Sequence, residues 1–249
     1  MKIYFASDFH LGIPDYNKSL EREKSICQWL KMAAQDADKI YLLGDCFDFW
    51  FEYKTAVPKG FTRFLGTIAE ITDSGVEVKI FKGNHDMWMF GYLEKECGVK
   101  TISDEEKLYI NDTKLFIHHG DGLGPGEPAY KWLRKLFRSS LCQWFFARIH
   151  PNFGIWLALT LSKRSRLAQK NHSEQYLGEE KEYLIQFIKQ NEKIEHFDFY
   201  IFGHRHIAME KTLENTRYIN LGEWLHNPHY AVFEGNNVSL KKWDGNNKN

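Results

Sequence analysis

The chain has few cysteines, and they are not arranged as a metal site. The four are widely separated, with no Cys-x-x-Cys pair: Cys27, Cys46, Cys97 and Cys142. This spacing argues against a structural zinc finger and gives no indication of a disulfide framework. A reduced, cytoplasmic setting is therefore expected. Cys46 lies inside a polar cluster, but we interpret it as a small residue that fills space.

The sequence also has no excess charge of either sign and no long apolar run. Thirty-three Lys and Arg balance thirty-three Asp and Glu in 249 residues, so no strong overall field indicates a nucleic-acid partner. The apolar stretch 153–161 is about half of the roughly 20 residues that cross a membrane. No basic segment precedes a long apolar stretch as in a signal peptide. We expect a soluble or peripheral protein.

Strand-like and helix-like stretches alternate along most of the chain. Helices are predicted at 19–36 and 60–74, and helical spacing dominates again from about 125 to 190. Apolar, β-branched or aromatic runs predict strands at 2–6, 39–43, 76–82, 114–117, 197–202, 217–221, 230–234 and 238–243. The pattern indicates one α/β domain over 1–243 with a helical insertion, or lid, at about 125–190. The polar residues 244–249 are expected to be a disordered tail.

Five short polar clusters follow predicted strands and hold most of the possible metal ligands. They are Asp8-Phe9-His10, Gly44-Asp45-Cys46-Phe47-Asp48, Gly83-Asn84-His85-Asp86, His118-His119-Gly120-Asp121 and Gly203-His204-Arg205-His206. Strands that end at one edge of a sheet can bring such loops to one point. One Asp after a strand is usually a helix cap, and one His a partly buried side chain. Five clusters of the same chemistry instead predict a two-metal hydrolase.

The order of these motifs resembles that of calcineurin-like metallophosphoesterases. The resemblance implies a four-layer α/β/β/α sandwich and two divalent metal ions, with manganese expected and iron or zinc as alternatives. It places one ion on Asp8, His10, Asp45 and His206, and the other on Asp45, Asn84, His119 and His204. The residues themselves favour Asp45 as the bridging carboxylate, because Gly44 before it allows close approach.

Three residues are predicted to be catalytic: Asp45, Asn84 and His85. His85 is the candidate general acid or charge stabiliser, because it follows a ligand and need not bind metal itself. Its alternative role is a hydrogen bond to a neighbouring carboxylate that only holds the loop. Asp48 and Asp121 are interpreted as carboxylates that orient histidine ligands.

The insertion combines large apolar side chains with basic ones at helical spacing. The apolar set is Tyr130, Leu133, Phe137, Leu141, Trp144 and Phe145, and the basic stripe beside it is Lys131, Arg134, Lys135 and Arg138. Amphipathic helices with basic flanks suit an acyl-chain pocket and contact with an anionic membrane surface. The alternative is a lid packed on the core with a solvated basic stripe.

The chain is most similar to the UDP-2,3-diacylglucosamine pyrophosphohydrolases of lipid A biosynthesis. The resemblance is in Gly44-Asp-Cys-Phe-Asp-Phe-Trp50, His119-Gly-Asp-Gly-Leu123, Leu221-Gly-Glu-Trp224 and the cationic insertion. It implies cleavage of a UDP-linked acylated sugar to lipid X and UMP, by a cytoplasmic enzyme held peripherally at the inner face of the inner membrane. The candidate substrate contacts are then Glu127, Tyr130, Lys163, Arg164, Arg166 and Lys170.

One position departs from this resemblance. His85 stands where those hydrolases commonly carry Arg, whereas Gly-Asn-His-Asp is the general form of the superfamily. Another nucleotide or lipid-linked phosphodiester or pyrophosphate is therefore the alternative substrate. A non-catalytic module is disfavoured by the complete ligand set. A nuclease is disfavoured because the basic residues cluster with apolar ones and do not line an open groove.

Overall fold

The computed structural model describes the chain except residues 126–127, 174–175, 177 and 246–249; the side chains of 129 and 165–173 are also left undescribed. Most of the expected tail at 244–249 thus lies outside the described residues. Among the helices that the structure describes, none combines the length and the apolar composition needed to cross a bilayer.

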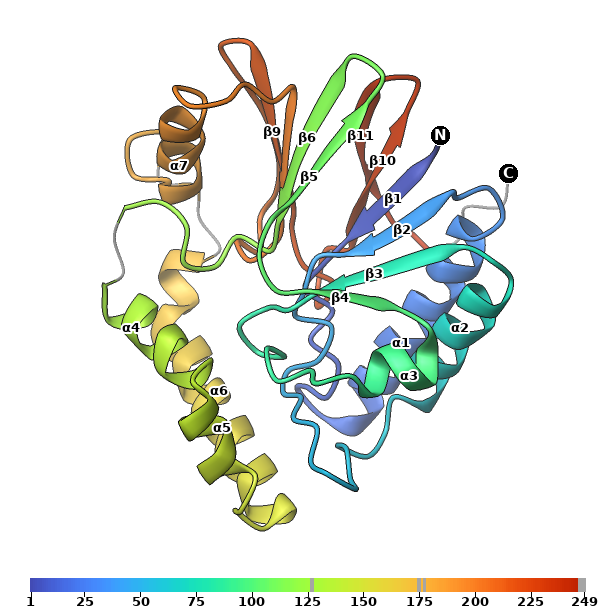
Figure 1. Ribbon diagram of the computed structural model, residues 1–249, viewed down its shortest axis with the longest axis vertical. Helices are drawn as coiled ribbons and strands as arrows, with labels where there is room; N and C mark the ends of the chain where they lie inside the picture. Colours follow the sequence, from blue (N-terminus) through green and yellow to red (C-terminus); the bar gives the residue numbers. More distant parts are fainter. Residues whose placement is uncertain (126–127, 174–175, 177, 246–249) are drawn as a thin grey trace.

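Two mixed β-sheets form the centre of the molecule (Figure 1). The first sheet has the order β11-β10-β1-β2-β3-β4, and the second has the order β5-β6-β7-β9-β8. Strands β1 to β4 run parallel to one another, as do β6, β7 and β9. The strands are β1 Ile3–Ala6, β2 Lys39–Leu42, β3 Glu77–Phe81, β4 Lys100–Ile102, β5 Glu106–Ile110, β6 Thr113–His118, β7 Phe199–Phe202, β8 Ala208–Leu213, β9 Thr216–Leu221, β10 His229–Glu234 and β11 Asn237–Lys242.

Helices cover the outer face of each sheet, so the fold has four layers. The first sheet packs against α1 Tyr16–Ala33, α2 Thr62–Asp73 and α3 Tyr92–Cys97, and the second against α7 Tyr183–Asn191. Between the sheets lies a third apolar core, which includes Phe5 and Tyr41 from one side and Ile117 and Ile201 from the other. Because the parallel strands are buried on both faces, their sequences are continuous apolar runs. The predicted α/β/β/α sandwich is confirmed.

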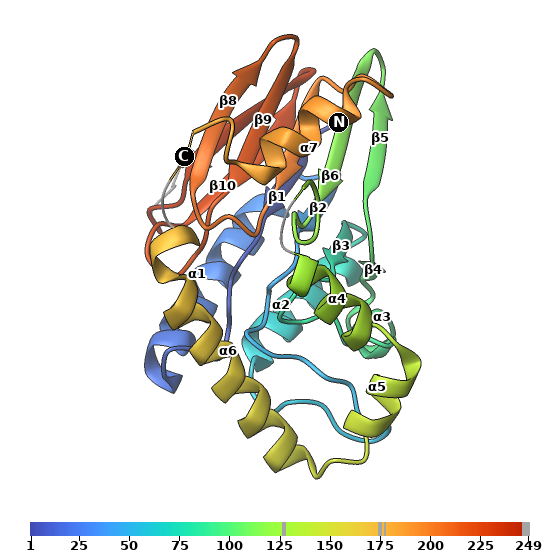
Figure 2. The same cartoon turned by 90° about the vertical axis from the view of Figure 1, so that its left-hand side faces the viewer.

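The lid consists of three helices that extend to one side of the sandwich (Figures 1 and 2). They are α4 Pro128–Phe137, α5 Ser140–Phe146 and α6 Pro151–Ser173. A break separates α4 from α5 because the Ser139 side chain accepts a hydrogen bond from the Cys142 N–H, which starts a new helix. Helix α7 lies in the range expected for the insertion, yet it belongs to the sandwich, since Leu184, Ile185 and Ile188 are buried in the core of the second sheet.

Candidate metal centre

The seven candidate ligands lie on loops at the carboxyl ends of five strands. Asp8 and His10 follow β1, Asp45 follows β2, and Asn84 follows β3, the three parallel neighbours of the first sheet. In the second sheet His119 follows β6, whereas His204 and His206 follow the adjacent parallel strand β7. The two sheets therefore deliver their loops to a common edge, as expected from parallel strands.

Four of these residues have a left-handed backbone, which is uncommon for residues other than glycine. Their φ angles are 56° for Asp8, 45° for His10, 51° for Asp45 and 66° for His204. Such conformations persist only where surrounding contacts enforce them, and they gather at functional sites. Here the His204 N–H donates to Asp8 Oδ2 at 2.9 Å, so one ligand loop holds another.

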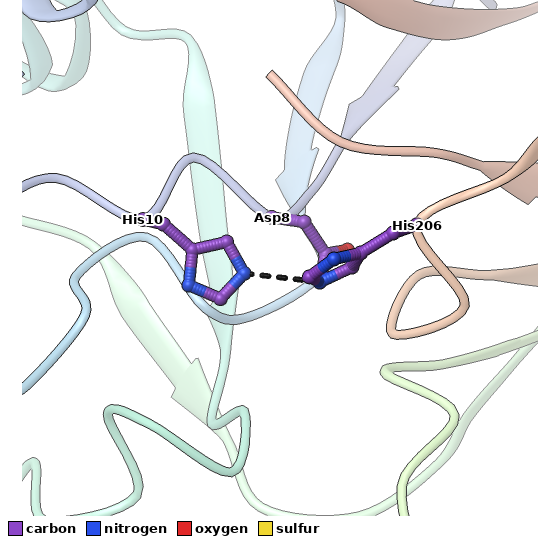
Figure 3. Close-up of side chains that lie close together, drawn as sticks. All are labelled: Asp8, His10 and His206. Carbon is purple, nitrogen blue, oxygen red and sulfur yellow. Dashed lines mark hydrogen bonds and ion pairs between the residues drawn. The ribbon is translucent and has the colours of Figure 1, made fainter. Parts of the chain in front are cut away.

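The side chains form three overlapping groups that could hold metal ions. In each group the ligand atoms lie within 4.8 Å of one another: Asp8 with His10 and His206, His10 with Asp45 and His85, and Asp45 with His119 and His204. Figure 3 shows the first group, in which the Nε2 atoms of His10 and His206 are 3.1 Å apart. Asp45 is shared by two groups, the position that a bridging carboxylate requires.

Two histidine rings are oriented toward the candidate metal centre by contacts of their Nδ1 atoms. The Nδ1 of His119 donates to the Leu43 carbonyl, so its Nε2 faces Asn84 Oδ1 at 3.2 Å and Asp45 Oδ2 at 3.5 Å. The Nδ1 of His10 lies 3.4 Å from Asp48 Oδ1. Outer partners of this kind fix the ring orientation of metal-binding histidines.

The buried carboxylates create a demand for positive charge. Burial opposes ionisation of Asp8, but hydrogen bonds from His10 and His206 hold its pKa well below the usual value. Burial also opposes ionisation of Asp45, yet the charge on His119 lowers its pKa. In the described part of the chain, the ion-pair partners of Asp8 and Asp45 are all histidines. A set of carboxylate, amide and imidazole donors, in which only histidines pair with the buried carboxylates, fits two divalent cations.

A calcineurin-like phosphoesterase family model matches residues 1–208. The chain belongs to this family. It is 36% identical to the UDP-2,3-diacylglucosamine hydrolase of Porphyromonas gingivalis over 98% of both chains. Hydrolases of the same name from Haemophilus influenzae and Histophilus somni are 27% and 24% identical and match 90% of this chain and 91% and 92% of theirs. The resemblance read from the motifs is confirmed, and this phosphoesterase is a metal-dependent hydrolase.

His85 lies between the metal centre and the lid of this phosphoesterase. Its backbone N–H donates to Asp45 Oδ1 at 2.9 Å, and its ring is 5.0 Å from that of His10. Its Nδ1 is 3.1 Å from the carbonyl of Asp48 and 3.1 Å from Ser162 Oγ of α6. The ring therefore belongs to a group that could bind metal and also contacts the lid. Its proposed catalytic role stays a prediction.

Asp121 connects the loop of His119 to helix α4. Its Oδ2 accepts from the Tyr130 hydroxyl at 2.9 Å and lies 2.7 Å from Arg134 Nε. Within the described residues, neither of these partners is a histidine, so its expected role in orienting a histidine also stays a prediction. These contacts instead hold helix α4 of the lid against the loop that carries His119.

The candidate substrate contacts are only partly described. The Tyr130 ring lies 6.4 Å from that of His204, so it faces the metal centre. Lys163 and Arg164 on α6 are exposed. Glu127 and the side chains of Arg166 and Lys170 lie outside the described residues.

Two supporting residues were missed by the motif analysis. The buried Arg22 of α1 donates to the carbonyls of Phe9, His10 and Ile13 and so holds the loop after β1. A single arginine in a predicted helix gives no indication that it is buried, so the sequence could not have identified this role. Asp86 accepts N–H groups of Gly83, Asp45, Cys46 and Phe47, which ties two ligand loops together. Its place in the Gly-Asn-His-Asp motif was a signal that could have identified it.

Proposed function

We propose that this phosphoesterase hydrolyses the pyrophosphate of UDP-2,3-diacylglucosamine to 2,3-diacylglucosamine 1-phosphate, which is lipid X, and UMP. A relative that is named UDP-2,3-diacylglucosamine hydrolase and matches 98% of this chain supports the proposal. The observation that carries it is an apolar cluster beside the metal centre, because a soluble nucleotide substrate would not need one.

This cluster is built jointly by the sandwich and the lid. Its buried members are Phe49, Phe51 and Trp88, and the partly buried members packed on them include Phe137, Phe146, Ile155, Ala158 and Leu159. Phe146 lies 4.8 Å from Phe51 and 4.6 Å from Trp88, measured between ring centroids. Acyl chains would pack among these side chains and so pass from water into an apolar environment.

The apolar cluster also lies close to His85, the residue proposed to serve the leaving group. Leu159 belongs to the cluster, and Ser162, less than one helical turn later, contacts His85. Three residues of helix span about 5 Å. An acylated sugar could thus place its phosphate at the metal centre and its chains in the cluster.

We propose that two manganese ions bind at the centre, with iron or zinc as alternatives. One would be held by Asp8, His10, Asp45 and His206, and the other by Asp45, Asn84, His119 and His204. When bound, such ions supply the Lewis acidity that activates water near neutral pH and offsets charge on phosphoryl oxygens.

The protein's own groups would orient the diphosphate and serve the leaving group. The Asp48 carbonyl accepts a hydrogen bond from His85 Nδ1, and the Ser162 hydroxyl contacts the same atom. In its imidazolium form the ring would carry a second N–H on Nε2, which would stabilise the departing oxygen or transfer its proton to it. The amide of Asn84 can hydrogen-bond to a phosphoryl oxygen next to it. Tyr130, Lys163 and Arg164, with Glu127, Arg166 and Lys170, are the proposed contacts to the rest of the substrate.

Product analysis in the presence of manganese tests the substrate. We expect UMP from UDP-2,3-diacylglucosamine and none from UDP-N-acetylglucosamine, which has the same diphosphate but no long acyl chains. Equal release from both would reject the apolar cluster as the basis of specificity and retain only the phosphoesterase.

A second candidate is another nucleotide or lipid-linked phosphodiester or pyrophosphate. His85 favours it, because an imidazole ring held by Nδ1 has a single N–H left for a phosphate, on Nε2, where a guanidinium offers a bidentate fork. Cleavage of a generic phosphodiester with no release of UMP from the acylated substrate would select this candidate.

We also propose a cytoplasmic location with peripheral attachment to the inner face of the inner membrane. The support is the outer face of the lid, where Trp132, Leu141 and Phe145 are exposed. Large exposed aromatic and aliphatic groups mark contact surfaces.

A further inference from the structure

A buried ion pair joins helix α7 to the loop that carries two candidate metal ligands. Arg205 lies between His204 and His206 in that loop, and Glu182 is the residue immediately before α7. The pair is bidentate, since Arg205 Nε donates to Glu182 Oε2 at 3.0 Å and Nη2 donates to Oε1 at 2.8 Å. Glu182 is 1% exposed and Arg205 is 8% exposed, so both charges are withdrawn from water. Neither residue is itself a candidate ligand.

Stability of the fold is a weak reason for this pair. Taking two charges out of water is costly, and apolar residues of similar volume often stabilise a protein as well or better. Glu182 also occupies the N-cap position of α7, yet within the described structure its carboxylate does not cap that helix and pairs with Arg205 instead. A bidentate pair does supply a fixed geometry, because the planar guanidinium matches both carboxylate oxygens at once.

Helix α7 gives the pair a rigid anchor. Its side chains Leu184, Ile185 and Ile188 are buried in the core of the second sheet. Glu182 comes directly before this packed segment, so the sandwich holds it in place. Its carboxylate can therefore fix the guanidinium and, through it, the backbone of Arg205.

The backbone is tightly turned on both sides of Arg205. The Arg205 N–H donates to the Gly203 carbonyl at 2.7 Å, and the Arg205 carbonyl accepts from the Ile207 N–H. Between Gly203 and Arg205, His204 has a left-handed φ of 66°. In a loop turned this tightly, a rotation at Arg205 redirects the side chains before and after it.

The two histidines that flank Arg205 belong to different groups of candidate ligands. His206 Nε2 lies 3.3 Å from Asp8 Oδ1 in one group. The His204 ring lies 5.1 Å from that of His119 in another group, and the two groups have no residue in common. One contact at the residue between the histidines can thus set the orientation of both.

We propose that Glu182 and Arg205 are positioning residues that direct His204 and His206 to their separate ions. The pair acts through the backbone of the loop and not by ligation. Breaking it therefore weakens the binding of both ions, although each histidine serves only one. The inference rests on the proposed function in that it assumes the two-ion assignment given there.

Titration calorimetry with manganese on the metal-free full chain tests the pair. Glu182→Gln keeps the size of the side chain but removes its charge, and Arg205→Lys keeps the charge but loses the fork. We expect each variant to bind both ions about tenfold or more weakly, as is usual when an outer partner of metal-binding histidines is lost. Hydrolysis of a soluble phosphodiester should fall at limiting manganese and recover in excess manganese, with KM unchanged.

Two further proteins separate positioning from stability. Glu182→Leu combined with Arg205→Met replaces the pair by apolar side chains, so without metal it should unfold at about the temperature of the unmodified chain. It should still bind manganese as weakly as the single variants. Glu192→Gln is the matched control at the other end of α7, where the carboxylate accepts from the Phe197 N–H and the Tyr200 hydroxyl. It should lower the unfolding temperature and leave the manganese affinity unchanged.

Three outcomes would overturn the proposal. Unchanged manganese affinity in Glu182→Gln and Arg205→Lys, with a lower unfolding temperature, would make the pair a support of the fold alone. Loss of one ion while the other binds as before would show that the pair holds one histidine and not both. Equal weakening by Glu192→Gln would make the effect a general one of α7.

The proposed function fails on different measurements. The substrate assignment depends on UMP release by the unmodified chain, which these variants do not enter. If the unmodified chain binds fewer than two manganese ions, the ion assignment fails and this inference fails with it. If it binds two and the variants bind them equally well, only the positioning role is rejected.

Discussion

The metal centre and the lid of this phosphoesterase differ in how much of their surface the fold covers. Asp8, His10 and Asp45 are at most 1% exposed, whereas Trp132 and Leu141 of the lid are each 66% exposed. The sandwich buries the ligand loops at the edge of its sheets, whereas the described chain leaves the outer faces of α4 and α5 exposed. We infer that the sandwich determines the reaction and that the lid determines which molecule reaches it.

The two regions nevertheless meet at defined contacts. Tyr130 of α4 donates to Asp121, and Ser162 of α6 reaches His85. Each contact joins a lid helix to a loop that carries a candidate ligand. Substitutions in the metal centre, in the lid and at the contacts between them can therefore test whether the sandwich determines the reaction and the lid determines the substrate.

The largest effect is expected from the shared carboxylate. Asp45→Asn keeps the volume but removes the negative charge that two cations would share, so we expect loss of both ions and of activity by on the order of 10³-fold or more. Manganese should raise the unfolding temperature of the unmodified chain, because it binds only the folded state, and should not do so for the variant. Metal analysis that finds two ions in an active Asp45→Asn protein would refute the bridging assignment.

A smaller loss is expected at His85, which contacts both regions. His85→Ala removes the proposed proton donor, so kcat should fall by about 10²-fold or more while the metal content is unchanged. Steady-state kinetics on a soluble phosphodiester and metal analysis check this. Because the geometry also groups His85 with His10 and Asp45, loss of one ion would instead identify His85 as a ligand.

The sequence alone indicated which loops meet at the candidate metal centre, because the signal for them is local. Each ligand follows an apolar strand directly, and buried parallel strands leave little choice of where the next polar residue lies. The carboxyl ends of β1, β2, β3 and β7 were predicted to within one residue for this reason. Asp45 could be singled out because of Gly44, where an added Cβ would lie 2.8 Å from the backbone of Gly83.

The elements that were missed have weak or misleading local patterns. Strand β4 is only three residues long, and the amphipathic strands β5 and β8 lie at the two edges of the second sheet. Helical spacing in the lid placed Trp144 and Phe145 on an apolar face, but both are exposed, and Phe146 packs inward instead. Helical periodicity identifies an apolar face but does not show which of its side chains pack against the rest of the protein. That packing depends on residues distant in the sequence.

The two faces of the lid provide the next comparison. Phe146→Ser should lower kcat/KM for detergent-dispersed UDP-2,3-diacylglucosamine by about tenfold or more, because it removes apolar contact area from the cluster. Phe145→Ser changes the adjacent exposed ring and should have little effect. Neither variant should affect a soluble phosphodiester. Equal losses with both substrates would show that the cluster supports the fold and not the acyl chains.

The smallest expected effect concerns Ser162, where the lid touches the centre. Ser162→Ala removes one hydroxyl contact to His85, which is worth about 1 kcal/mol, or roughly fivefold in rate. If the hydroxyl positions the imidazole, kcat should fall equally for acylated and soluble substrates, with KM and metal content unchanged, and Ser162→Thr should restore it. A rise in KM for the acylated substrate alone would instead assign Ser162 to substrate binding. The lid would then select the substrate without any influence on the reaction that the sandwich carries out.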